Sequence, residues 1–176
     1  MTHVAFLRAI NVGGRAVVKM ADLQAAFARA GCRHVRTFIA SGNVLFDAPA
    51  RLRTQITAEL VAVFGKEPGV CYRTLAQLDA LIDSAPFGTR VSDTSLKLYV
   101  AFMDRVPAKV PALPTIVEKE LVEIVAIRGA DMLIVSRRKP NGMYGFPNAC
   151  VEDLGVRATT RNWNTVTRLA AFARKG

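Results

Sequence analysis

Hydrophobic and polar positions alternate along this chain in short blocks that predict a mixture of strands and helices. Over roughly the first seventy residues, apolar runs of strand length alternate with two segments whose apolar residues recur every three or four positions. The second of these segments carries Leu52, Ile56 and Leu60 on one helical face. The predicted elements are strands at 3–10, 35–40, 43–46 and 70–73 and helices at 20–30 and 51–64. This strand–helix–strand–strand–helix–strand order is that of the ferredoxin-like split βαβ unit.

A second, less regular series follows a predicted connecting helix at 75–84 and a polar connection at 89–95. The three prolines of segment 104–114 exclude a long regular element there. The remaining predictions are strands at 96–103, 122–127, 132–136 and 157–160, short helices at 115–120 and 148–154, and a terminal helix at 162–173. The order again suggests βαββαβ. The sequence therefore predicts an α+β fold of two ferredoxin-like (βαββαβ) halves in tandem, with a connecting helix and a C-terminal helix.

The predicted boundaries place the first half with the connecting helix at residues 1–84 and the second half with the C-terminal helix at residues 96–176. Whether the halves form one compact unit is left open.

Three clusters of polar, turn-forming residues interrupt this mainly aliphatic chain where predicted elements begin or end. They are residues 7–14 with Lys19-Met20, residues 41–44 and residues 160–166. Each is rich in the Gly, Asn or Arg that tight backbone paths and anion contacts require. Together they resemble the pattern of a bacterial family called domain of unknown function 1697, from near residue 3 to near residue 170. The resemblance implies two ferredoxin-like halves and a set of candidate positions. It implies no reaction, because that family has no established activity.

The first cluster has two interpretations. Arg8 ends the first strand, and Gly13-Gly14 lie in the loop before a helix, where successive backbone N–H groups can surround an anion. Lys19 supplies a full charge. The glycine spacing matches neither a P-loop nor a dinucleotide fingerprint. The same residues also suit a purely structural turn, in which Asn11 hydrogen-bonds to its own backbone.

Each of the other two clusters also has a structural and a ligand-binding interpretation. The segment from Ser41 to Asn43 predicts a tight hairpin, and its polar side chains offer a ligand surface as the alternative. In the third cluster Asn162 or Thr160 is a suitable cap for the last helix, while Arg161 and Asn164 point away from the core as hydrogen-bond donors.

A basic run at Arg137–Lys139 is followed by a Pro- and Gly-containing turn with Tyr144 and Phe146. The simplest interpretation is a solvated loop. The aromatic residues also suit stacking on bases, or a flap over a cleft.

Composition sets limits on the class of protein. The chain of 176 residues is 51% hydrophobic, which predicts a buried core and argues against disorder. It has no apolar run of membrane-spanning length and no secretory leader, so we expect a cytoplasmic bacterial protein without a membrane partner. The three cysteines and two histidines lack metal-ligand spacing. We therefore expect reduced thiols, no metal and no cofactor.

The formal net charge of +10 permits an anionic partner without identifying one, because the basic excess is spread over both halves. We predict a binding module for a phosphorylated small molecule or nucleic acid. The candidate ligand-binding residues, expected to line one cleft, are Arg8, Asn11, Gly13, Gly14, Lys19, Ser41, Asn43, Arg161, Asn162 and Asn164. One alternative is a small transferase or hydrolase acting on a phosphorylated substrate, although no nucleophile or general base is identified. Another is an interaction protein whose turns are only structural. The oligomeric state is left open.

Overall fold

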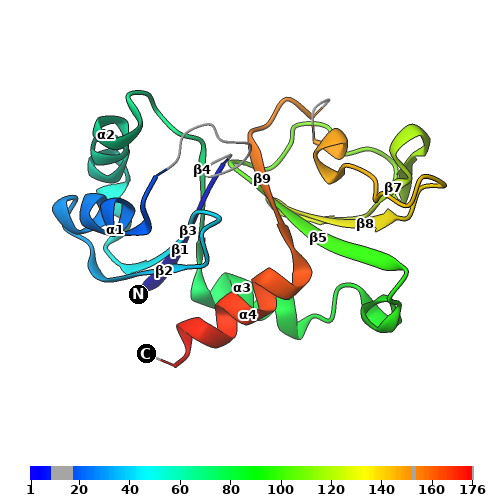
Figure 1. Cartoon of the computed structure of the whole chain (residues 1–176), viewed down its shortest axis with the longest axis horizontal. Helices are drawn as coiled ribbons and strands as arrows, with labels where there is room; N and C mark the ends of the chain where they lie inside the picture. Colours follow the sequence, from blue (N-terminus) through cyan, green and yellow to red (C-terminus); the bar gives the residue numbers. More distant parts are fainter. Residues whose placement is uncertain (9–17, 152–153, 176) are drawn as a thin grey trace. The chain divides into compact units, whose positions relative to one another are not determined.

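The computed structural model describes residues 1–8, 18–151 and 154–175 of the chain. Within these ranges it is a mixed α+β fold with two antiparallel sheets and four α-helices (Figure 1). The chain divides into two compact units. Unit 1 comprises Met1–Leu78 and Ala171–Gly176, and unit 2 comprises Asp79–Ala170.

Unit 1 has the predicted βαββαβ order. Its strands form one antiparallel sheet in the spatial order β2-β3-β1-β4. The elements are β1 (Thr2–Leu7), α1 (Met20–Arg29), β2 (Arg33–Phe38), β3 (Asn43–Asp47), α2 (Arg53–Phe64) and β4 (Val70–Thr74). A short 3-10 turn at Ala50–Leu52 leads into α2.

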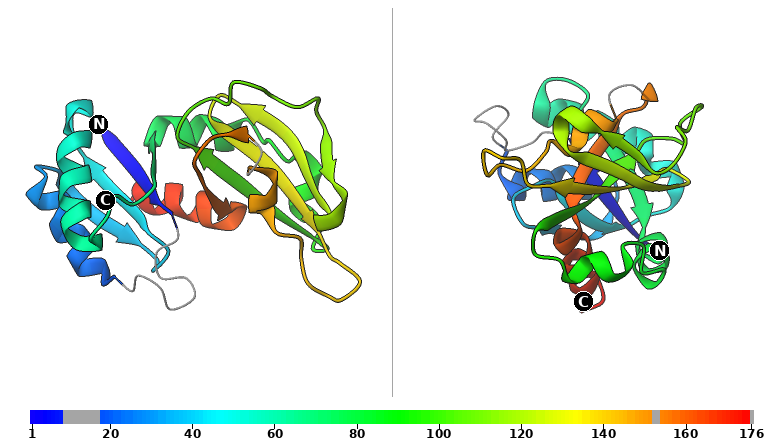
Figure 2. Two further views of the ribbon diagram at one scale, coloured as in Figure 1. Left: turned by 90° about the horizontal axis from the view of Figure 1, so that it is seen from above. Right: turned by 90° about the vertical axis from the view of Figure 1, so that its right-hand side faces the viewer.

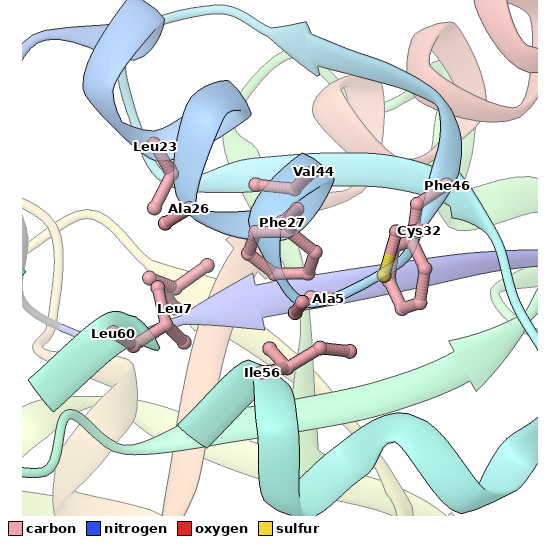
Figure 3. Packing of buried hydrophobic residues seen from close by; sticks show 11 residues of the cluster. Ala5, Leu7, Leu23, Ala26, Phe27, Cys32, Val44, Phe46, Ile56 and Leu60 are labelled. Atoms are coloured by element: carbon pink, nitrogen blue, oxygen red, sulfur yellow. The ribbon is translucent and has the colours of Figure 1, made fainter. Parts of the chain in front are cut away.

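The core of unit 1 lies between this sheet and the two helices that cover one of its faces (Figures 1 and 2). Alternate residues of β1, Ala5 and Leu7, point toward the helices because side chains alternate across a strand. Leu23 and Phe27 of α1 and Leu60 of α2 meet them and are fully buried (Figure 3). The predicted apolar faces of both helices are therefore confirmed.

The last residues of α4 (Trp163–Ala173) also belong to unit 1, where they pack against β2. The guanidinium of Arg36 donates to the carbonyl of Ala173 over 3.1 Å, and its carbon lies 4.9 Å from the centre of the Phe172 ring. Phe38 stacks at an angle on the same ring.

Unit 2 contains a five-stranded antiparallel sheet in the order β6-β7-β8-β5-β9. Its strands are β5 (Leu96–Met103), β6 (Thr115–Val117), β7 (Val122–Arg128), β8 (Asp131–Arg137) and β9 (Ala158–Asn162). The helix α3 (Leu75–Asp83) leads into this unit from unit 1, and 3-10 turns occur at Gly88–Ser92, Glu118–Glu120 and Pro147–Cys150. The terminal helix α4 begins directly after β9, and its residues Val166 and Leu169 are fully buried.

Two short helices predicted in the second half differ from the observed elements. Thr115–Val117 is a strand that pairs with β7, and only Glu118–Glu120 form a 3-10 turn. Three consecutive residues that are β-branched favour this extended backbone over a helix. Of the short helix predicted over 148–154, the described residues show a 3-10 turn at Pro147–Cys150, and residues 152 and 153 lie outside the described ranges. The described residues between β5 and β9 form no α-helix, so the tandem ferredoxin-like arrangement is not confirmed.

The domain boundaries at 1–84 and 96–176 stay a prediction. No helix within the described ranges is long and apolar enough to cross a lipid bilayer.

We expect Leu60→Ala to lower the free energy of unfolding by roughly 2–5 kcal/mol, because it leaves a cavity in the core of unit 1. The neighbouring Val61, 37% exposed on the same helix, provides the matched control. Val61→Ala should change the free energy by about 0.5 kcal/mol or less. Chemical denaturation of both variants measures these values, and equal losses would contradict the assignment of Leu60 to the core.

Candidate functional site

The end of β1 and the β2–β3 turn lie together in unit 1. The N–H of Leu7 donates to the carbonyl of Gly42 over 2.8 Å, and the N–H of Arg8 donates to the carbonyl of Gly69, also over 2.8 Å. A Cβ on Gly69 would lie 3.3 Å from the Cβ of Arg8, so the glycine lets the two backbones approach. The structure therefore brings Arg8 of the first cluster beside the second cluster. Asn11, Gly13 and Gly14 lie outside the described residues.

Asn43 has a structural role in the turn between β2 and β3. Its side chain is fully buried and donates to the carbonyl of Phe38 over 3.1 Å and to the hydroxyl of Ser41 over 2.9 Å. Gly42 adopts the left-handed conformation, with φ of 77°. The predicted hairpin is confirmed. Arg8 and Lys19 keep exposed side chains.

Unit 2 contains a cleft of about 470 Å³ where β5 begins and β9 ends. The two strands pair antiparallel, with Tyr99 opposite Asn162. This register carries the start of α4 to the first residues of β5. The lining residues come from segments far apart in the sequence, and they are Arg90, Val91, Asp93, Thr94, Leu96, Lys97, Leu98, Tyr144, Asn162, Trp163, Asn164 and Thr167.

Lys97 is one of the two cations among the described lining residues. Its Nζ lies 4.2 Å from the centre of the Tyr144 ring, a cation–π contact. Within the described part of the chain, no carboxylate forms an ion pair with Lys97. The aromatic ring thus positions the ammonium group and leaves its positive charge uncancelled.

Arg90 is the second cation of the cleft, and its ion pair is long. Its Nη2 lies 3.9 Å from Oε1 of Glu123. The other oxygen of this buried carboxylate accepts from Arg137 at 2.5 Å. Glu123 is therefore paired mainly with Arg137, and the guanidinium of Arg90, itself exposed, is only weakly held.

The predicted third cluster contributes to this cleft in part. Asn162 caps α4, because its Oδ1 accepts from the N–H of Asn164 over 2.9 Å. It also hydrogen-bonds to the Tyr99 hydroxyl. Burial is the main cause that raises the pKa of Tyr99, the neighbouring phenol of Tyr144 raises it further, and the hydrogen bond to Asn162 opposes the rise.

Arg161 is not among the residues that line the cleft. Its Nη1 donates to the hydroxyl of Thr159 over 2.7 Å and to the carbonyl of Thr160 over 3.0 Å. Of the predicted site, Arg8, Lys19, Ser41 and Asn43 belong to unit 1, and Arg161, Asn162 and Asn164 belong to unit 2. The prediction that all of them line one cleft stays a prediction.

The basic run Arg137–Lys139 begins at the last residue of β8, and it is partly neutralised within unit 2. Arg137 pairs with Glu123, and Nζ of Lys139 lies 2.7 Å from Oε2 of Glu120. Nε of Arg138 donates to the carbonyl of Gly142 over 3.0 Å and so closes the turn. Residues 138–146 form a long loop beside the sheet, drawn in amber in Figure 2. Two of the three cations in the run Arg137–Lys139 are thus paired with carboxylates, and Arg138 stays exposed.

Gly145 fixes the base of this loop and with it the position of Tyr144. A Cβ on Gly145 would lie 1.7 Å from the carbonyl oxygen of Glu120 and 2.6 Å from Cγ2 of Val122. The carbonyl of Gly145 accepts from the buried hydroxyl of Ser136 over 2.9 Å. The close approach of the two backbones leaves no space for any side chain.

No group of three or more His, Cys, Asp or Glu side chains in the described ranges is arranged to hold a metal ion. All three cysteines are buried, and none forms a disulfide. Burial raises the pKa of Cys32 and of Cys150 to about 11, so these thiols are poor nucleophiles at neutral pH.

Comparison with known proteins gives a family. The model of a family described as protein of unknown function (DUF1697) matches residues 1–132. This chain belongs to the DUF1697 family. A comparison with curated proteins found no match. The family match ends before the third cluster. It includes the candidate residues Arg8, Lys19, Ser41 and Asn43 of unit 1 and the cleft residues from Arg90 to Leu98.

A solved structure of similar fold is the conserved bacterial protein SP0830 from Streptococcus pneumoniae. It superimposes with a TM-score of 0.64 at 18% sequence identity, over 97% of each chain. At this identity the similarity shows a shared fold and no more.

Arg90 and Lys97 are not among the ligand-binding residues predicted from the sequence. The only signal for Lys97 is a single charge between the apolar Leu96 and Leu98 at the start of a strand. Arg90 lies in a polar connection that offers no motif.

We expect Gly145→Ala to lower the free energy of unfolding by roughly 1–3 kcal/mol or more, because the new methyl group collides with backbone rather than with a movable side chain. Met143→Ala in the same loop is the control, since Met143 is 66% exposed. Thermal denaturation compares the two variants. A Gly145→Ala protein as stable as Met143→Ala would refute the close packing at the base of the loop.

Proposed function

We propose that this DUF1697 protein is a binding module for an anionic small molecule, held in the unit 2 cleft. The observation that carries the proposal is Lys97, whose ammonium group rests on the Tyr144 ring instead of on a carboxylate. A cation that is positioned but not neutralised favours a negatively charged ligand.

The charge balance of the lining supports this choice. Arg90 and Lys97 oppose a single carboxylate, Asp93, which leaves an excess of one positive charge. Oδ1 of Asp93 already accepts from the backbone N–H and the hydroxyl of Ser95, over 2.9 and 2.6 Å. One oxygen of the Asp93 carboxylate is thus already used as an acceptor within its own turn.

Uncharged donors complete the lining. Thr94 and Asn164 supply a hydroxyl and an amide group, and the first turn of α4 adds partial positive charge from its backbone N–H groups. The Thr167 hydroxyl is already used, because it donates to the carbonyl of Asn164 over 3.2 Å. Mixed full charges and neutral donors are the groups that bind phosphate and carboxylate oxygens in proteins.

Binding is favoured over catalysis because the described lining residues offer no general base suited to neutral pH. Hydrogen bonds from Ser95 lower the pKa of Asp93, the only carboxylate among those residues. General bases work best with a pKa near the operating pH. The transferase or hydrolase alternative therefore lacks a proton acceptor in this cleft.

The experiment uses Trp163, the single tryptophan of the chain and a lining residue of the cleft. Its fluorescence reports occupation of the cleft in the unmodified protein. We expect phosphorylated metabolites to change this fluorescence in a saturable way. Lys97→Gln should weaken that binding by roughly 1.5–3 kcal/mol, the range for hydrogen bonds to charged groups.

Lys109→Gln is the matched control. Lys109 is an exposed lysine of the same unit that does not line the cleft. It removes one charge from unit 2 and should leave the affinity nearly unchanged. Equal weakening by both substitutions would show attraction by the general positive field. No saturable response to any phosphorylated compound would refute the proposal.

A further inference from the structure

The size of the cleft indicates that its ligand is more than a simple oxyanion. This step rests on the proposed function. About 470 Å³ is space for roughly fifteen water molecules at about 30 Å³ each. A bare phosphate contacting Lys97 and Arg90 would leave most of that volume to solvent. The cleft therefore has room for an uncharged body attached to the anionic group.

The remaining lining suits a flat aromatic body. Apolar contact comes from Val91, Leu98 and Trp163, and a ring face from Tyr144. Trp163 is itself held in place, because its ring packs edge-on against Phe87 with 5.2 Å between the ring centres. Only 9% of Trp163 is exposed, so it contributes a fixed apolar edge, and the partly exposed Tyr144 supplies the ring on which a heterocycle can stack.

A polar group is placed beside these rings. Asn164 lines the cleft with an exposed side chain, while its backbone N–H is already bound to Asn162. An asparagine amide offers one donor and one acceptor side by side. That pair matches the hydrogen-bonding edge of a nucleobase.

We infer that the ligand is a nucleoside monophosphate unit, with its phosphate on Lys97 and Arg90 and its base against Tyr144 and Asn164. The unit is either a free nucleotide or one nucleotide of a single strand. Both sources present the same base and phosphate, so the structure assigns the shared chemistry and the experiment separates the sources.

The test measures a ratio of affinities by titration calorimetry, with adenosine monophosphate and glycerol phosphate as probes. Both probes carry a phosphate, and only the first carries a base. Wild-type protein should bind the nucleotide about tenfold more tightly, which corresponds to about 1.4 kcal/mol. Tyr144→Leu should abolish this preference, and Tyr144→Phe, which keeps the ring, should retain it. Lys97→Gln should weaken the binding of both probes by a similar factor.

Met143→Ala controls for disturbance of the loop, since it alters the neighbouring exposed residue and leaves the ring in place. Its ratio should equal the wild-type value. A wild-type protein that binds both probes equally would overturn the nucleotide inference while leaving the anion-binding proposal intact. A wild-type protein that binds neither probe would also overturn the nucleotide inference, and the anion-binding proposal falls with it if the fluorescence titrations with phosphorylated metabolites show no saturable response either.

A tetranucleotide distinguishes the source. Tighter binding of the tetranucleotide than of the mononucleotide, with the same loss in Tyr144→Leu, supports the inference with nucleic acid as the source. Tighter binding of the mononucleotide supports it with a free nucleotide as the source. Tetranucleotide binding that is insensitive to Tyr144→Leu and falls equally in Lys97→Gln and Lys109→Gln overturns it, because the cleft would then contribute nothing specific.

Discussion

The antiparallel pairing of β5 with β9 is the constraint on which the unit 2 cleft depends. It sets Tyr99 opposite Asn162, so the chain leaves the sheet and enters α4 beside the first residues of β5. Lys97 and Asn164 are thereby brought to one cleft although almost seventy residues separate them. Shifting a strand register by one residue turns every side chain to the opposite face. A one-residue slip of β9 would therefore move Asn162 away from Tyr99. It would also move the start of α4 away from the cleft.

Some positive charges in the described part of unit 2 are paired with carboxylates, and others are not. Arg137 and Lys139 are paired with Glu123 and Glu120, so they stabilise the loop after β8 and contribute little to an external field. Lys97 is held by an aromatic ring that positions it without cancelling its charge. The formal charge of +10 is therefore a weaker guide to binding than the pairing of each cation. Selectivity in this account comes from a few unneutralised groups at one place.

The sequence predicted unit 1 better than unit 2 for physical reasons. The apolar spacing of Leu23 and Phe27 and of Ile56 and Leu60 is typical of helices that cover a sheet, and tertiary packing agrees with it. In unit 2 the β-branched Thr115–Val117 pair with β7 as an edge strand, a tertiary contact that local pattern does not reveal. The candidate site was predicted only partly. Asn162 and Asn164 line the cleft, while Arg161 is bonded to Thr159 and the buried Asn43 closes a turn. Arg90 and Lys97 lie in no motif, and only the fold places them together.

The most direct test of the central claim follows the indole N–H of Trp163 by nuclear magnetic resonance during a titration with a phosphorylated ligand. Since the chain has one tryptophan, this signal is unambiguous, and it reports from within the cleft. The account predicts that the indole resonance shifts with the same concentration dependence as the heat of binding. Saturable heat of binding with an unmoved indole resonance would contradict it, because the ligand would then occupy another part of the molecule.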